Sequence, residues 1–202
     1  MSGTVLEVFS DYVCPWCYLG YARVRQLRES HDIDVRLVHF PLHLETPDEG
    51  MSLEQLFAGR SVDVEQMQER MSALMRAEGL EYGDRTMTYN SRRAQQLAAW
   101  AVEREGGDAI HQALFTAYFV DGVNLAVVDH LVDIAASVGL DPDQARQSLR
   151  SPRYRAMVSA DWERSRAAGV TGVPTFVARG RELVGAQPLD VLAELIVQAG
   201  TS

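Results

Sequence analysis

The residues best suited to chemistry are Cys14 and Cys17, the two cysteines of the chain. They stand in the stretch CPWC, where Pro15 and Trp16 separate them. If two cysteines were placed at random, this spacing would arise about once in a hundred chains. Three kinds of chemistry suit such a pair: half of a metal site, a structural disulfide, or a reactive dithiol.

A zinc site is the least favoured of the three. Such a site needs four ligands, usually cysteine and histidine at paired spacings. His39 and His43 are four residues apart, but Pro41 lies between them and His39 falls in an expected strand. The other histidines, expected on helix surfaces or in the core, are His31, His111 and His130. We therefore expect no metal.

A structural disulfide is also disfavoured. The N-terminus runs directly into a strand-like pattern, so we expect no signal peptide and a cytoplasmic location. The cytoplasm is a reducing compartment in which stable disulfides are rare. A bridge that closes so short a loop would also stabilise the fold little, because the loop-entropy contribution grows with loop length.

A dithiol would give each sulfur a different task. A cysteine at the start of a helix lies in the positive field of the N-terminal N–H groups, which favours the reactive thiolate. We expect Cys14, which precedes the helix, to be the more exposed and attacking thiol. Cys17 lies one turn into the helix, and we expect it to be buried and to resolve the mixed disulfide that Cys14 forms.

The cysteines are expected between two parallel strands. Residues 4–10, TVLEVFS, and residues 34–40, DVRLVHF, both alternate in the manner of strands. Between them, Leu19 and Leu27 share one helical face, and Pro15 suits the first turn of a helix, where its missing N–H costs nothing. The order strand, helix, strand predicts a right-handed parallel βαβ unit.

The middle of the chain, from about Met51 to Ala168, shows the pattern of helices only. Asn90 is the expected N-cap of the helix that begins SRRAQQLAAW. Asp141 and Ser151 each precede a proline, an arrangement typical of the first residues of a helix. Two further helices are therefore expected to begin there.

Strand patterns return after this helical stretch. Residues 174–178 and 181–185 are expected to form a hairpin, followed by a helix that ends at Gly200. Pro174 opens the first of these strands, although proline cannot donate a hydrogen bond to a sheet. Either a cis Val173–Pro174 bond in a tight turn or an ordinary trans proline at a strand edge would explain its position.

Composition and element order together predict an α/β protein of two parts. With 202 residues, 47% of them hydrophobic, the chain can bury a substantial core. We expect a βαβ…ββα domain over residues 1–48 and 169–202, and a helical insertion over residues 49–168. The net charge of −9 argues against a nucleic-acid partner. No membrane contact is expected, since no apolar stretch reaches the ~18 residues that span a bilayer.

Four segments resemble the thioredoxin superfamily, and within it the FrnE-like group of the DsbA-like branch. They are SDYVCPWCYLG, NSRRAQQLA, LFTAYFVDGVNL and GVTGVPTFVARGRELVGAQP, which together extend from Ser10 to Pro188. This group is related to 2-hydroxychromene-2-carboxylate isomerases and kappa-class glutathione transferases. The resemblance implies a thioredoxin-like fold with a long all-helical insertion, and it makes a homodimer an expectation.

The resemblance also assigns roles to residues of this chain. It implies catalysis by Cys14 and Cys17, with Pro174 in the cis form beside them. Asn90 matches the residue that opens the helix facing the site in this group, and the backbone at Val173 matches the edge on which a substrate pairs. The residues expected to bind substrate or shield the sulfurs are Pro15, Trp16, Asn90 and Val173.

The chain departs from these relatives at two positions. Gln95 stands where the group has a histidine, so any role of that imidazole is lost. The isomerase and transferase relatives generally carry serine where Cys14 stands. Because this chain keeps both sulfurs, its resemblance favours redox chemistry.

The leading hypothesis is a cytoplasmic dithiol-disulfide oxidoreductase that exchanges or isomerises disulfides of proteins or small molecules. It requires no cofactor, and glutathione is considered as a redox partner. The alternative is a glutathione-dependent isomerase or kappa-like glutathione transferase. A third interpretation is a chaperone-like binding module whose apolar cleft matters more than its thiols.

Overall fold

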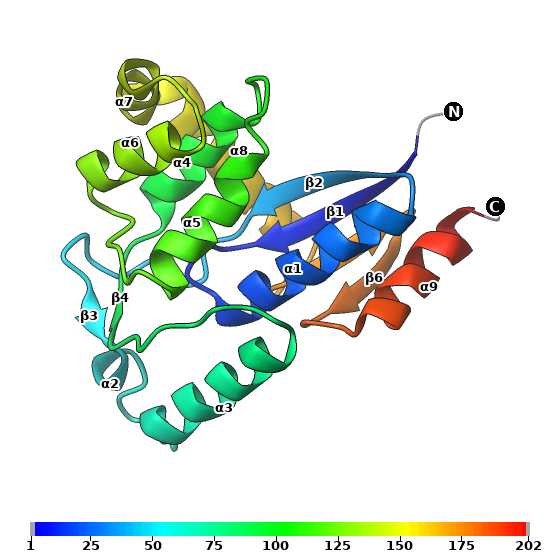
Figure 1. The fold of residues 1–202 in the computed structure, drawn as a ribbon, viewed down its shortest axis with the longest axis horizontal. Helices are drawn as coiled ribbons and strands as arrows, with labels where there is room; N and C mark the ends of the chain where they lie inside the picture. The colour runs from blue at the N-terminus through cyan, green and yellow to red at the C-terminus, as the bar shows by residue number, and fades with distance from the viewer. Residues whose placement is uncertain (1–2, 201–202) are drawn as a thin grey trace. The chain divides into compact units, whose positions relative to one another are not determined.

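The computed structural model describes residues 3–200, with side chains described over residues 3–198. These residues form two compact units (Figure 1). We call the residues up to Leu42 together with those from Asp161 onward the sheet unit, and His43–Ala160 the helical unit. Helix α8 (Pro152–Ala167) begins in the helical unit and ends in the sheet unit.

The predicted domain boundaries, 1–48 with 169–202 and 49–168, differ from this division at residues 43–48, which belong to the helical unit, and in their treatment of α8. They assign the whole helix to the insertion, whereas its last residues belong to the sheet unit. Residues 1, 2, 201 and 202 of that prediction lie outside the described residues.

The sheet unit is built on four strands in the order β2–β1–β5–β6. They are β1 (Thr4–Ser10), β2 (Ile33–His39), β5 (Thr175–Ala178) and β6 (Arg181–Val184). β1 pairs in parallel with β2 and antiparallel with β5, which forms a hairpin with β6. The predicted βαβ unit and C-terminal hairpin are confirmed.

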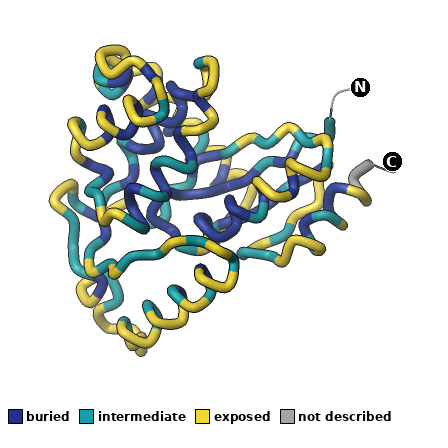
Figure 2. The backbone as a smooth tube through the Cα atoms, in the orientation of Figure 1, coloured by how far each residue is buried: buried dark blue, intermediate teal, exposed yellow. Residues whose placement is uncertain are grey.

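Helices α1 (Pro15–Ser30) and α9 (Leu189–Gly200) lie side by side against one face of this sheet (Figure 1). Successive side chains of a strand point to opposite faces, and Leu6 and Val8 of β1 enter the core beneath these helices. Figure 2 shows the buried stretch that runs from β1 into the first turns of α1. The cysteine pair therefore lies in a buried part of this unit.

The other face of β1 and β2 packs against the last turns of α8. The Arg164 guanidinium lies 5.9 Å from the centroid of the Phe9 ring and also forms an ion pair with Glu7. The Ser165 hydroxyl donates a hydrogen bond to the carbonyl oxygen of His39 at 3.2 Å. These contacts hold the end of β2 against α8.

The helical unit contains two short strands that the sequence analysis did not predict. Its helices are α2 (Leu53–Leu56), α3 (Val64–Ala77), α4 (Arg92–Ala101), α5 (Ala109–Phe119), α6 (Val128–Ser137), α7 (Pro142–Arg150) and the first part of α8. Two short strands, β3 (Met51–Ser52) and β4 (Met87–Thr88), also pair antiparallel within it. The prediction of helices only is wrong in this detail, because a strand of two residues is too short to show alternation.

The helix starts expected at prolines are confirmed, and the start expected at Asn90 is shifted. Asp141 is the N-cap of α7, and its carboxylate accepts a hydrogen bond from the N–H of Gln144 at 2.9 Å. Helix α4 has Ser91 rather than Asn90 as its N-cap. The Asn90 side chain still accepts from the N–H of Arg92 at 3.0 Å, so it caps the helix from one residue further back.

Gly20 allows α1 to approach the strand that follows Pro174. A Cβ atom at this position would lie 3.1 Å from Pro174 Cγ and 3.1 Å from Phe176 Cζ. Phe176 is fully buried in the core of the sheet unit. A larger residue at position 20 would therefore push apart the helix that carries the cysteines and the turn that contains Pro174.

The variant Gly20→Leu should lower the free energy of unfolding by about 1–3 kcal/mol, because overpacking a filled core strains the surrounding backbone. This loss outweighs the ~1 kcal/mol gained by removing a glycine from a helix. Denaturant-induced unfolding measures the change. The control Gln26→Leu adds the same side chain to an exposed position of the same helix and should stay within about 0.5 kcal/mol of the wild type. Equal stability of the two variants would contradict the packing argument.

Candidate active site

The loop that follows β1 presents the first cysteine, and Asp11 organises this loop. Asp11 is 1% exposed, and its carboxylate accepts hydrogen bonds from the N–H groups of Val13 at 3.4 Å and Leu42 at 2.9 Å. Its carbonyl oxygen accepts a hydrogen bond from the N–H of Cys14 at 3.2 Å. A side chain that accepts hydrogen bonds from nearby backbone N–H groups in this way favours one loop conformation. Cys14 is therefore held in a defined place at the end of β1.

Helix α1 begins directly at the dithiol. Cys14 is the N-cap residue, with φ −94° and ψ 115°, and Pro15 opens the helix. The N–H groups of Cys17 and Tyr18 donate to the carbonyl oxygen of Cys14 at 3.0 and 3.2 Å. Trp16 lies between the cysteines and is 39% exposed. Cys14 thus stands at the positive end of the α1 dipole, where a negative charge is stabilised.

The Val173–Pro174 turn lies against the first cysteine. The Val173–Pro174 peptide bond is cis. Cys14 Sγ donates a hydrogen bond to the carbonyl oxygen of Val173 at 3.5 Å. The Thr175 hydroxyl donates to the carbonyl oxygen of Gly172 at 2.8 Å, which closes the turn from within. Two segments separated by most of the chain thereby meet at one sulfur.

Cys17 is a protonated thiol at neutral pH. Burial raises the pKa of the Cys17 thiol well above its ordinary value, and a hydrogen bond with Cys14 adds to the increase. Hydrogen bonds from the backbone of Asp11 and the side chain of Ser10 act in the opposite direction. Both cysteines are free thiols. The structure therefore shows the reduced state of the pair.

The expected difference in exposure between the two cysteines is small. Cys14 is 3% exposed and Cys17 is 1% exposed. Cys14 is the more exposed of the two by only this small margin, because its sulfur lies against the Val173 carbonyl, and the expected burial of Cys17 is confirmed. The two sulfurs differ in their hydrogen bonds instead, since Cys14 bonds the proline turn and Cys17 bonds the loop after β1.

A buried histidine pairs with a partly exposed carboxylate at the end of β2. His39 Nδ1 is 2.7 Å from Asp161 Oδ2, which also accepts the backbone N–H of His39 at 3.2 Å. Nε2 of the same ring is buried and has no hydrogen-bond partner among the described residues. The His39 ring lies 6.4 Å from the ring of Tyr12, in the loop that carries Cys14. Burial raises the pKa of Tyr12 well above its ordinary value, so its hydroxyl stays neutral.

The predicted site residues fall into two groups. The sheet unit brings together Cys14, Cys17, Pro15, Trp16, Val173 and Pro174. Asn90 belongs to the helical unit, where its side-chain amide donates to the carbonyl oxygen of Thr46 at 2.8 Å. Its other amide atom caps α4, so Asn90 has a structural task within its own unit. The role of Asn90 in substrate binding stays a prediction.

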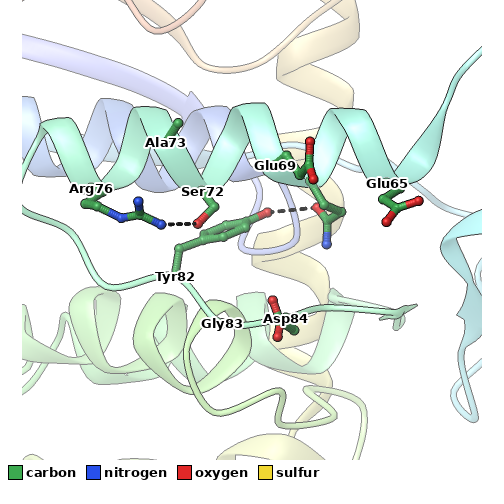
Figure 3. Close-up of a pocket in the computed structure, with 9 residues that line it drawn as sticks. Glu65, Glu69, Ser72, Ala73, Arg76, Tyr82, Gly83 and Asp84 are labelled. Atoms are coloured by element: carbon green, nitrogen blue, oxygen red, sulfur yellow. Dashed lines mark hydrogen bonds between the residues drawn. The ribbon is translucent and has the colours of Figure 1, made fainter.

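Other parts of the structure give weaker indications of a functional site. The described residues include no grouping of three or more His, Cys, Asp or Glu side chains able to hold a metal ion. No helix among them is long and apolar enough to cross a bilayer. A cavity of about 410 Å³ beside α3 is lined by carboxylates of Glu65, Glu69 and Asp84 (Figure 3). Polar side chains also line this cavity, among them Tyr82, whose hydroxyl donates a hydrogen bond of 3.3 Å to Gln68.

Sequence reasoning missed three residues that support the dithiol. Asp11 shapes the loop before Cys14, and its signal was a turn-forming residue directly after a strand. Gly20 lies beneath Pro174, and a glycine inside a helix pattern is a recognisable sign of close packing. Asp161 pairs with His39 across 122 residues of sequence, and nothing in the local pattern marks it.

A four-stranded sheet with a reduced cysteine pair at a helix start and a cis proline beside it defines the class of thioredoxin-fold oxidoreductases. Residues 5–197 match the family described as the DSBA-like thioredoxin domain. The chain belongs to this family and is an oxidoreductase of the DsbA-like type.

Known relatives share this architecture over nearly their full length. A probable DsbA oxidoreductase from Streptomyces coelicolor is 30% identical, with a TM-score of 0.88 over 98% of this chain and 91% of that chain. The cytosolic disulfide reductase DsbM from Pseudomonas aeruginosa, solved with GSH, is 22% identical, with a TM-score of 0.71 over 96% of this chain and 98% of that chain. The YwbO protein of Bacillus subtilis is 26% identical over 196 residues, which are 95% of this chain and 94% of that protein.

The raised pKa of Cys17 can be measured in Cys14→Ser, where Cys17 is the remaining thiol. A raised pKa lowers the thiolate fraction at neutral pH, so the alkylation rate with iodoacetamide should keep rising well above pH ~8.5, where an ordinary thiol is half ionised. Intact-protein mass spectrometry measures the rate, and a short cysteine peptide is the reference. The pH of half-maximal rate reports the pKa, because burial also limits access. A midpoint at or below that of the peptide would disprove the assignment.

Proposed function

We propose that the protein exchanges disulfides with protein or small-molecule substrates through Cys14 and Cys17. The observation that carries this proposal is the hydrogen bond of 3.5 Å from Cys14 Sγ to the Val173 carbonyl, beside the cis proline. It puts a thiol at a helix start next to a backbone edge on which a substrate can pair. Membership of the DSBA-like thioredoxin domain family supports the same reaction.

The reaction proceeds in two exchanges, written here in the reductive direction. The Cys14 thiolate attacks one substrate sulfur, so that a Cys14–substrate disulfide forms while the substrate disulfide breaks and its leaving thiolate takes up a proton. Cys17 then loses its proton, attacks Sγ of Cys14 and releases the second substrate thiol. Two electrons pass from the dithiol to the substrate. Oxidation is the reverse sequence, and isomerisation uses the first exchange and its reversal.

The different environments of the two sulfurs suit this order of events. The raised pKa of Cys17 keeps it protonated while Cys14 makes the first attack. Its hydrogen bond with Cys14 keeps it within reach of the mixed disulfide that must be resolved. An early thiolate at Cys17 would compete for the substrate. Its protonated state therefore favours attack by Cys14.

The backbone at Val173 offers a substrate both kinds of hydrogen-bonding group. Within the described part of the chain, the N–H of Val173 makes no hydrogen bond. Its carbonyl oxygen holds only the weak S–H donor of Cys14. An extended peptide could therefore pair with this residue while its disulfide lies over Cys14. This is the substrate position expected for Val173 and Pro174, with Pro15 and Trp16 at its edge.

Glutathione is the proposed partner that returns the oxidised pair to the dithiol. Two glutathione thiols would reduce the Cys14–Cys17 disulfide and leave as one glutathione disulfide, so no bound cofactor is needed. The DsbM protein, described as a cytosolic disulfide reductase and solved with GSH, supports testing this partner. Two closely spaced cysteines, both free, suit the reducing cytoplasm, which is the proposed location. The expected homodimer stays a prediction.

The tasks of the two sulfurs can be separated with single serine variants. Cys14→Ser should abolish turnover of insulin disulfides, because no thiol remains to make the first attack. Cys17→Ser should accumulate a mixed disulfide through Cys14, visible by mass spectrometry of the intact protein. Circular dichroism serves as the folding control. Wild-type turnover by Cys14→Ser would overturn the proposal, and activity against client aggregation in the double variant would favour a chaperone-like module.

Glutathione distinguishes disulfide exchange from a glutathione-dependent isomerase or transferase. In the proposed reaction, each substrate disulfide reduced yields one glutathione disulfide. When glutathione disulfide is added to the Cys17→Ser variant, Cys14 forms a mixed disulfide with one glutathione and the other leaves as a thiol. An isomerase would bind glutathione saturably and form product without net oxidation of thiols. Coupled measurement of glutathione disulfide and of product therefore decides between them. Product formation without glutathione disulfide would remove the oxidoreductase proposal.

A further inference from the structure

A second cavity in the helical unit has the character of an anion site. It has a volume of about 450 Å³ and lies where the start of α4 meets the junction of α7 and α8. All of its lining residues belong to the helical unit. We call it the arginine cavity, after Arg92, Arg93, Arg150 and Arg155, which line it.

The positive charges of the arginine cavity are only partly neutralised. Arg93 pairs with Asp48, the one carboxylate among the described lining residues, at 2.7 Å. Arg150 and Arg155 form no ion pair with any residue in the part of the chain that the structure describes. The lining therefore carries an excess of positive charge in a chain whose net charge is −9.

The surroundings of Arg92 disfavour its positive charge. Its guanidinium donates to the Ser159 hydroxyl at 2.7 Å. Burial and the nearby charge of Arg155 lower the pKa of Arg92 below its ordinary value. Like charges held together in this way destabilise the empty cavity, and a bound anion would relieve the repulsion.

The side-chain amide of Gln96 in the wall of the cavity offers further hydrogen-bonding groups to a ligand. Gln96 is 6% exposed and lines the cavity. Its side chain makes no hydrogen bond within the described range, and its amide atoms are not among the fully buried ones, so they are open to a ligand in the cavity. An amide N–H₂ group in this position can donate to an oxyanion. The side-chain amide of Gln96 is therefore available to hydrogen-bond a ligand.

Helix ends at the cavity contribute partial charges of both signs. Helix α4 begins at Arg92 and α8 begins at Pro152, and both residues line the cavity. Each helix start carries a partial positive charge, whereas the end of α7 at Arg150 carries a partial negative charge. The first N–H groups of α4 and α8 already bond to Asn90 and Ser151, so the arginine side chains supply the excess of positive charge. The cavity beside α3 shows the opposite lining in the same unit, with the carboxylates of Glu65, Glu69 and Asp84 against the single guanidinium of Arg76 (Figure 3). Positive lining is thus a local property of the arginine cavity.

We propose that the arginine cavity binds a small phosphate-bearing anion, such as a phosphomonoester or a diphosphate. Guanidinium groups match phosphate oxygens in a bidentate manner, and a phosphate of nearly two negative charges suits the excess of positive charge better than a single carboxylate does. Asn90 also lines the cavity, and its role in binding the disulfide substrate stays a prediction. No other lining residue of the cavity is assigned to the disulfide chemistry of Cys14 and Cys17.

Calorimetric titration of the full chain with inorganic pyrophosphate tests the proposal. We expect saturable binding of one pyrophosphate per chain, weakened by added salt. Arg150→Glu and Arg155→Glu should each weaken it by about tenfold or more, because each removes charge-assisted hydrogen bonds and adds repulsion. The matched control Arg70→Glu changes the same charge at an exposed position of α3 outside the cavity, and should change affinity by less than about twofold.

Two further measurements make the test specific. Gln96→Leu should weaken pyrophosphate binding without a change in net charge, and circular dichroism checks that each variant is folded. The Cys14→Ser/Cys17→Ser protein should bind pyrophosphate as the wild type does. Absence of saturable binding, an equal loss in Arg70→Glu, or binding of glutathione but not of pyrophosphate at this cavity would each overturn the proposal.

Discussion

Strand β1 is the element on which the sheet unit depends, because its two edges carry the hydrogen bonds that join the N-terminal and C-terminal parts of the chain. Its register sets Ser10 opposite His39 on one edge and Phe9 opposite Thr175 on the other. The C-terminal ends of β1 and β2 and the N-terminal end of β5 therefore lie at the same end of the sheet. Backbone pairing alone brings the dithiol loop and the proline turn together there, before any side-chain contact is made.

Much of this arrangement is readable from the sequence, because it depends on local signals. The alternation of β1 and β2, a proline at the first position of α1 and a glycine-containing hairpin each follow from short-range preferences, and the structure has all of them. The distance between Cys14 and Val173 is not a local property. It is predictable only through a resemblance that covers both segments at once.

The features that escaped prediction depend on tertiary packing. Burial of Cys14 results from the Val173 carbonyl above it, and no spacing rule reports such a contact. The pairing of His39 with Asp161 joins β2 to α8 and is equally invisible in a window of residues. The cap expected at Asn90 differs by one residue from the observed cap at Ser91, because Asn and Ser are both good capping residues and their succession does not distinguish the two positions.

The hydrogen bond from Cys14 to Val173 also links the redox state of the pair to the hydrogen-bonding capacity of the backbone. The bond exists only while Cys14 keeps its S–H proton. Once that sulfur enters a disulfide it has no proton to donate, and the Val173 carbonyl becomes free to accept from another group. In the proposed reaction this occurs at the moment of covalent capture. The turn can therefore hold a captured chain through two backbone groups and lose one of them when the thiol is restored, which favours release of the product.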